Sequence, residues 1–121
     1  MAKENRLTAP LPNVWMGVSD EGDRHERIGI LRETPAAVRF ISFEPLICDP
    51  GTVSLDGISW AIIGGESGKN HRLCELSWIT EIANQCREAG VAVFVKQDSG
   101  LHSGAQGRIP DNIWAMKEWP K

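Results

Sequence analysis

The chain has 121 residues, 41% hydrophobic and 24% charged, with a net charge of -3. These values predict one soluble domain with a modest core over residues 14–121, behind a polar lead-in over residues 1–13. The negative charge argues against general nucleic-acid binding, and no apolar run is long enough to span a membrane. No apolar signal sequence opens the chain, so we expect a cytoplasmic protein.

The first half of the chain predicts a strand, a helix and a second strand. An apolar run over residues 14–18 is bounded by polar residues, as expected of a short buried strand. Ser19 and Asp20 can cap a following helix, which we expect over residues 21–33. A second apolar run predicts a strand over residues 38–43.

A loop separates this half from the third predicted strand. Residues 47–57 contain proline and glycine, which indicates a loop with at most a short extended piece at residues 53–55. The third strand is expected over residues 58–63, and a glycine-containing loop over residues 64–70 follows it.

The clearest helical pattern follows Ser77, which we predict as its N-cap, and Gly90 is placed to close the helix. One face of this helix is apolar and contains Ile79, Ile82, Ala83 and Cys86. A fourth strand is expected over residues 91–95, followed by a loop at 99–107 and a short helix or turn within 110–119.

This order of elements predicts an α/β fold with a parallel sheet of about four strands, covered by helices. In such folds, ligands bind at the C-terminal ends of the strands. Four strands cannot close a barrel. The domain is therefore either a small open sheet or part of a barrel, whose exposed inner face would seek a partner.

Polar residues follow the predicted strands where such a site would lie. Ser19, Glu44 and Glu66 follow the first three strands, and Lys96 and Gln97 follow the fourth. The two carboxylates could form an acid/base pair, hold a ligand or pair with Lys96; a structural salt bridge or a helix cap is the alternative. Lys96 would be costly to bury alone, so we expect a carboxylate partner for it.

The loop that follows the third strand contains Gly64, Gly65, Glu66 and Ser67. It is not a P-loop, because the first glycine of that motif is replaced by isoleucine and asparagine follows the lysine. The loop could still hold an anion through backbone N–H groups, or its glycines could only make a tight turn.

Cysteine and histidine residues do not predict a metal site. The three cysteines contain no C-x-x-C pair, and Cys86 fits the core. His25, His71 and His102 are expected at the surface, although His71 and Cys74 form an isolated H-x-x-C pair. Among the tryptophans, Trp15 and Trp60 are expected in the core, and Trp114 and Trp119 could cover an open edge or contact a partner.

Several segments, taken together, resemble a radical-SAM-like family of phage and prophage proteins of unknown function. The segments are PNVWMGVS (12–19), RI (27–28), TPAAVRFISFEPL (34–46), LDGISW (55–60) and GGESG (64–68). Arg72, residues 86–90 and residues 94–97 fit the same pattern.

The resemblance implies the C-terminal half of a TIM-type barrel. The resemblance also implies that family members begin with an N-terminal half, whose clustered cysteines would hold a 4Fe-4S cluster that binds S-adenosylmethionine. The present sequence contains no such cluster of cysteines. For this chain alone the resemblance implies no cofactor. It does imply ligand contacts from Ser19, Glu44, Glu66, Arg72, Lys96 and Gln97. The family usually has an aromatic residue where this chain has Asp98.

Three hypotheses follow. The first is a barrel half that supplies cofactor and substrate contacts, completed by a partner chain or by self-association. The second is a non-catalytic binding or assembly module, a half-barrel that forms a homo-oligomer or docks on another protein. The third is a small enzyme that uses Glu44, Glu66 and Lys96 in acid/base chemistry. Fold alone does not decide among them.

Overall fold

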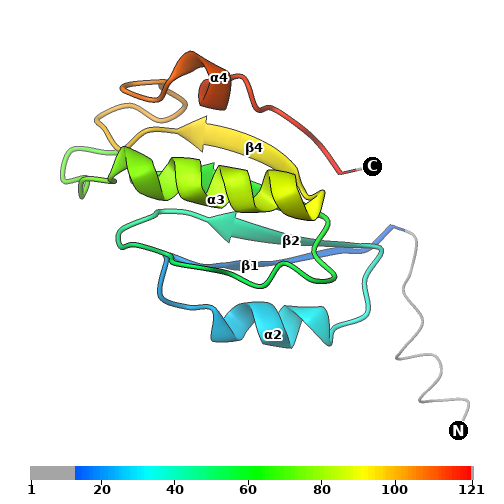
Figure 1. The fold of residues 1–121 in the computed structure, drawn as a ribbon. Coiled ribbons are helices and arrows are strands. Elements are labelled where there is room, and N and C mark those ends of the chain that lie inside the picture. Colours follow the sequence, from blue (N-terminus) through cyan, green and yellow to red (C-terminus); the bar gives the residue numbers. More distant parts are fainter. Residues whose placement is uncertain (1–12, 121) are drawn as a thin grey trace, which may run out of the picture.

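The computed structural model describes residues 13–120, so the lead-in expected over residues 1–13 lies outside the described residues except for Asn13. The elements in order are β1 (Trp15–Ser19), α2 (Glu26–Arg32), β2 (Val38–Phe43), β3 (Trp60–Gly64), α3 (Leu76–Ala89), β4 (Ala92–Gln97) and α4 (Asp111–Trp114). All four strands are parallel and lie in the order β1-β2-β3-β4 (Figure 1). The predicted α/β fold is confirmed.

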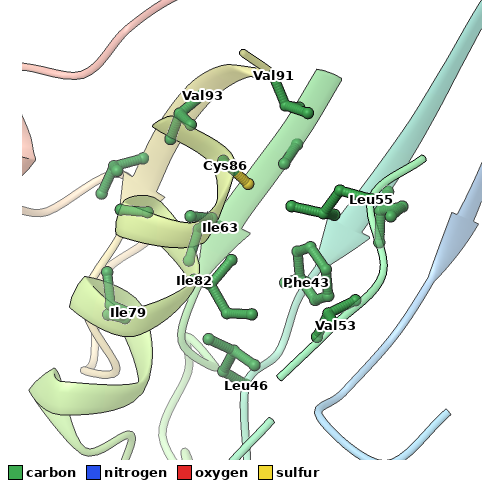
Figure 2. Close-up of a cluster of buried hydrophobic side chains, with 14 of the residues drawn as sticks. Phe43, Leu46, Val53, Leu55, Ile63, Ile79, Ile82, Cys86, Val91 and Val93 are labelled. Carbon is green, nitrogen blue, oxygen red and sulfur yellow. The ribbon is translucent and has the colours of Figure 1, made fainter. Parts of the chain in front are cut away.

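One face of the sheet forms the core with α2 and α3. Alternate residues of β2 and β3 are fully buried on this face, namely Ile41, Phe43, Ala61 and Ile63. They belong to one apolar cluster with Ile28 of α2 and Ile82 of α3. Figure 2 shows the α3 side chains Ile79, Ile82 and Cys86 lying beside Ile63 and Phe43. Among the described residues 13–120, no helix of comparable length lies on the opposite face (Figure 1).

The opposite face is aromatic toward the N-terminal ends of the strands. The Trp60 ring contacts both Trp15 and Phe40, with ring centroids 6.1 and 5.7 Å away. Trp119 stacks on Trp60 at 4.8 Å, and the Trp60 indole N–H donates to the Glu118 carbonyl at 2.9 Å. Trp60 is buried as predicted, but Trp15 is 46% exposed, so its prediction as a core residue was wrong. Trp15 is exposed because β1 is an edge strand.

Helix α3 starts close to its predicted position. It begins at Leu76 after an extended Glu75, rather than after Ser77, and no side chain caps it. The Cys74 N–H donates to Ser99 Oγ at 2.9 Å, which fixes the chain just before the helix. Gly90 ends the helix with a φ of 73°, the left-handed conformation that glycine adopts most easily, as predicted.

Helix α2 is shorter than predicted because Asp20 binds the chain ahead of it. The Asp20 carboxylate accepts hydrogen bonds from the Gly22 and Arg24 N–H groups, both at 2.9 Å. These bonds hold residues 20–25 in turns, so the helix starts at Glu26 instead of residue 21.

The segment 47–57 contains no strand, but two of its residues complete the core. Val53 and Leu55 are each 7% exposed and pack in the same cluster as Phe43. Gln85 of α3 holds this segment, since its side chain accepts from the Val53 N–H and donates to the Gly51 carbonyl, both at 2.8 Å. The short helix expected near the C-terminus is present as α4.

His25 was predicted to be a surface histidine, but its ring is half-buried and hydrogen-bonded through both nitrogens. Its Nδ1 lies 2.5 Å from the buried Asp20 carboxylate, and its Nε2 lies 2.6 Å from the Pro50 carbonyl. Both acceptors are satisfied only when both ring nitrogens carry a proton. Burial alone would lower the pKa of His25, but the hydrogen bonds to Asp20 and Pro50 together raise it above 6.5.

This arrangement predicts that stability depends on pH through His25. A histidine whose pKa is raised by folding stabilises the protein fully below its unfolded value of about 6.5, and this contribution is lost as pH rises through the folded pKa. We expect urea midpoints measured between about pH 5.5 and 8.5 to fall with rising pH, and His25→Gln to flatten this dependence. Exposed His102, replaced by Gln, is the matched control. An unchanged slope in His25→Gln would contradict the interpretation.

Candidate functional site

A carboxylate follows each of the four parallel strands at the edge where their C-terminal ends meet (Figure 1). These residues are Asp20, Glu44, Glu66 and Asp98, after β1, β2, β3 and β4 in turn. Each carboxylate has a cationic partner, namely His25, Lys96, Arg72 and Arg108 in the same order. The edge is therefore a row of four charge pairs.

Three of these carboxylates pair within the loop that follows their own strand and are well supplied with hydrogen bonds. Asp98 is 3% exposed and accepts from the Arg108 backbone and side chain at 2.8–3.0 Å. Burial alone would raise the pKa of Asp98, but the hydrogen bonds from Arg108 lower it. Arg108 also donates to the Cys74 carbonyl at 2.8 Å, so the pair joins two loops. This pair is structural.

Glu66 is held in a similar way by Arg72. Its carboxylate accepts from the Arg72 backbone N–H at 2.8 Å and from the guanidinium at 3.0 and 2.7 Å. These hydrogen bonds lower the pKa of Glu66 to about 2. A carboxylate that stays ionised at neutral pH is a poor general acid. Glu66 therefore pairs with Arg72, and no ion pair joins it to Lys96 among residues 13–120.

Glu44 is the exception, because its cation comes from a different strand. Lys96 Nζ lies 3.1 Å from Glu44 Oε2, which provides the carboxylate partner expected for this lysine. Ser42 Oγ donates to Glu44 Oε1 at 3.2 Å. The buried Oε2 contacts Nζ as an ion pair, and it receives no hydrogen bond of good geometry within residues 13–120.

The surroundings of Glu44 are polar and closely packed. Ser19 lies opposite Ser42 in the β1–β2 register, on the helix-free face. A Cβ at Gly64 would lie 3.1 Å from Glu44 Oε2, so a larger residue there would crowd the carboxylate. Ser42, Glu44 and Lys96 thus form a polar patch above the aromatic part of the same face. An acceptor oxygen and an ammonium this close can bind a ligand that has both hydrogen-bond donors and acceptors.

The glycine loop after β3 is fixed by its neighbours. The Gly65 N–H donates to the Gln97 carbonyl at 3.0 Å, and the Gly68 N–H donates to the Gly100 carbonyl at 2.9 Å. A Cβ at Gly65 would lie 2.4 Å from the Ser99 backbone nitrogen, so only glycine allows this approach. These contacts favour the tight-turn alternative for the loop.

The predicted site residues thus lie in three places. Ser19, Glu44, Gly64 and Lys96 lie on the helix-free side of the strand ends. Glu66, Ser67 and Arg72 lie in the loop after β3, where Gly65 packs on Ser99. Gln97 is buried, and its side chain donates to the Gly65 carbonyl and accepts from the Gly104 N–H. Their role in ligand binding stays a prediction.

Sequence reasoning missed several contributors to this edge. Ser42 could have been found, because it precedes Glu44 by two residues and therefore shares its face of the strand. The partnership of Asp98 with Arg108 gave no local signal, since it depends on how the intervening loop folds back. Asp98, where the sequence departs from the family that it resembles, is buried.

Two of the three cysteines do not fit an iron–sulfur cluster. Cys74 and Cys86 are fully buried, and burial raises the pKa of each thiol to about 12, which disfavours the thiolate that a metal needs. Within residues 13–120, no three His, Cys, Asp or Glu side chains come together to hold a metal ion. None of the helices described is long and apolar enough to cross a membrane.

Fold and site define an α/β protein with a one-sided parallel sheet and a row of charge pairs at its strand ends. Residues 1–116 match the family described as "Protein of unknown function (DUF5131)", and the chain belongs to this family. No curated protein and no solved structure matches the chain.

The Glu66–Arg72 pair predicts an abnormal carboxyl titration. We expect the Glu66 side-chain carboxyl to titrate near pH 2 by carbon-13 NMR, because Arg72 stabilises its ionised form. The stabilisation is present above pH 4.5 and is lost as pH falls toward 2. In Arg72→Ala the midpoint should return toward 4.5. A midpoint near 4.5 in the unchanged protein would disprove the pairing.

The close approach of Gly65 to Ser99 predicts a strong difference between two glycines. Gly65→Ala forces backbone movement and should destabilise the fold by about 1–3 kcal/mol, which corresponds to a fall of roughly 4 °C or more in Tm. Gly100→Ala is the control, since its Cβ would meet nothing within 4 Å. Equal Tm values for the two variants in calorimetry would contradict the packing described.

Proposed function

We propose that this chain is the C-terminal part of a radical-SAM-like (β/α) barrel of phage or prophage origin, acting in the cytoplasm, and that its helix-free face contacts a small-molecule ligand. The arrangement of the sheet supports the barrel interpretation. The strands are parallel and in sequential order, and α2 and α3 pack on one face of the sheet. A barrel has the same arrangement, because right-handed crossovers between sequential strands keep the helices on one face. Doubly wound sheets reverse the strand order and cover both faces.

The open acceptor on Glu44 is the observation that supports ligand binding most directly. Its Oε2 is buried and lacks a hydrogen bond among the described residues, although buried polar atoms are nearly always paired. The other three strand-end carboxylates take their hydrogen bonds from their own loops. A ligand N–H or O–H group could donate the hydrogen bond that Oε2 of Glu44 lacks.

This chain would contribute binding and orientation rather than the reactive group. In the family that the sequence resembles, S-adenosylmethionine and a cluster supply the radical chemistry. The buried cysteines here do not fit the cluster, so we assign no step through it to this chain. Glu44 would accept hydrogen bonds from an ammonium or hydroxyl group, and Lys96 would face a carboxylate or other acceptor.

A second candidate function is a non-catalytic assembly module. The exposed edge of β1, with Trp15 and Met16 46% and 39% exposed, favours it. The acid/base enzyme is less well supported, because Glu66 is held ionised by Arg72.

S-adenosylmethionine is the probe that tests the first candidate. We expect isothermal titration calorimetry to detect its binding to the purified chain and Glu44→Gln to weaken it by about 10-fold or more, because a charge-assisted hydrogen bond is lost. Glu81→Gln, on the exposed side of α3, is the matched control and should bind normally. Absence of binding, or equal affinity in both variants, would refute this assignment for the chain.

A further inference from the structure

The two edges of the sheet differ in their backbone partners. The outer edge of β4 is occupied by the segment after α4, since the Val95 N–H donates to the Met116 carbonyl and the Glu118 N–H donates to the Val93 carbonyl, both at 2.8 Å. Phe94 and Lys117 form an antiparallel bridge there. A further strand cannot add to β4 without displacing this segment.

Within the described residues 13–120, the outer edge of β1 has open backbone groups. The Val14 carbonyl and the Asp20 N–H bond to β2, so by alternation the intervening residues at even positions also face β2. The N–H and C=O groups of Trp15 and Gly17 therefore point away from the sheet. Among residues 13–120, the outward carbonyl of Ser19 is bonded by Arg27 Nη1 at 3.0 Å.

Exposed apolar side chains belong to this edge strand. Two of the six large hydrophobic residues exposed among the described residues lie in β1, namely Trp15 and Met16. β1 contains no charged residue and no proline, and its register with β2 has no bulge. Natural edge strands usually contain a charged residue, a proline or a bulge that prevents pairing with another strand. Because β1 has none of the three, we expect its edge to pair.

We propose that β1 pairs with β1 of a second copy of this chain, antiparallel about a two-fold axis near Gly17. A head-to-tail arrangement, β1 against β4 of the next copy, is blocked by the segment that covers β4. The remaining closed arrangement is isologous, with the same edge of each copy in the interface. A two-fold axis perpendicular to the sheet reverses the direction of the strand, so the two β1 strands run antiparallel. Trp15 of one copy then lies opposite Ser19 of the other.

Charges at the ends of the edge favour the same orientation. Arg27 lies at the C-terminal end of β1, where it bonds to Ser19. Glu33 follows α2 and is exposed near the N-terminal end of β1, because α2 runs back beside that strand. Antiparallel pairing brings Arg27 of one copy toward Glu33 of the other, whereas parallel pairing would bring like charges together.

A pair of five-residue strands makes a small interface, at the low end of the sizes found for specific complexes. The dimer therefore forms and dissociates with concentration in the micromolar range. This inference extends the assembly candidate and does not depend on ligand binding at Glu44. In a barrel completed by a different chain, the same edge would instead take a parallel strand of that chain, and the chain purified alone would be a monomer.

Sedimentation velocity over a range of micromolar concentrations tests the pairing. We expect the purified chain to shift from monomer to dimer as concentration rises, and Met16→Lys to stay monomeric because two lysines meet near the axis. Leu101→Lys is the matched control, since Leu101 is 58% exposed and lies in the loop after β4. A monomer at every concentration, or a dimer that survives Met16→Lys, overturns the proposal.

Charge reversal tests the orientation independently of packing. Arg27→Glu alone should raise the dissociation constant by about 5-fold or more, because it faces Glu33 of the other copy. Adding Glu33→Arg to the same chain should restore association. Failure of the double variant to recover, with circular dichroism showing each chain folded, would exclude the antiparallel arrangement.

Discussion

The structure depends on burying only one face of a parallel sheet. Ile41, Phe43 and Ile63 lose all contact with water because α2 and α3 cover the same side. This arrangement follows from taking the strands in sequential order, which keeps each right-handed crossover on one side. The cost is an opposite face that the helices cannot cover, and the aromatic and polar features of the molecule lie there.

The chain deals with this face in two ways along the strands. Toward the N-terminal ends, Trp60, Phe40 and Trp119 pack on one another and remove much of the aromatic surface from water. Toward the C-terminal ends, the face becomes polar and carries Glu44 and Lys96. Along the strands, this face therefore changes from apolar near their N-terminal ends to polar near their C-terminal ends, where Glu44 and Lys96 form an ion pair.

The row of charge pairs separates structural carboxylates from the one that is incompletely bonded. Asp20, Glu66 and Asp98 fix their own loops, and each has several donors. Glu44 fixes no loop of its own and reaches across to β4. In the sequence all four residues are acids at strand ends, and only the number of hydrogen bonds that each accepts tells Glu44 from the other three.

The backbone groups at the two outer edges of the sheet differ in the same way. Those of β4 are bonded by the C-terminal segment, whereas those of Trp15 and Gly17 in β1 are open within residues 13–120, which suggests that another strand can bind at β1.

The sequence by itself determined the elements whose signals are local. Four apolar runs, one helix with a 3.6-residue period and Gly90 at its end sufficed for the parallel sheet and for α3, because side-chain periodicity and backbone preference act within a few residues. It also placed polar groups at the strand ends. Only the tertiary structure decided which cation meets which carboxylate, that Val53 and Leu55 complete the core, and that Trp15 is left exposed at an edge. Those outcomes depend on contacts between residues distant in the chain, and no local pattern encodes such contacts.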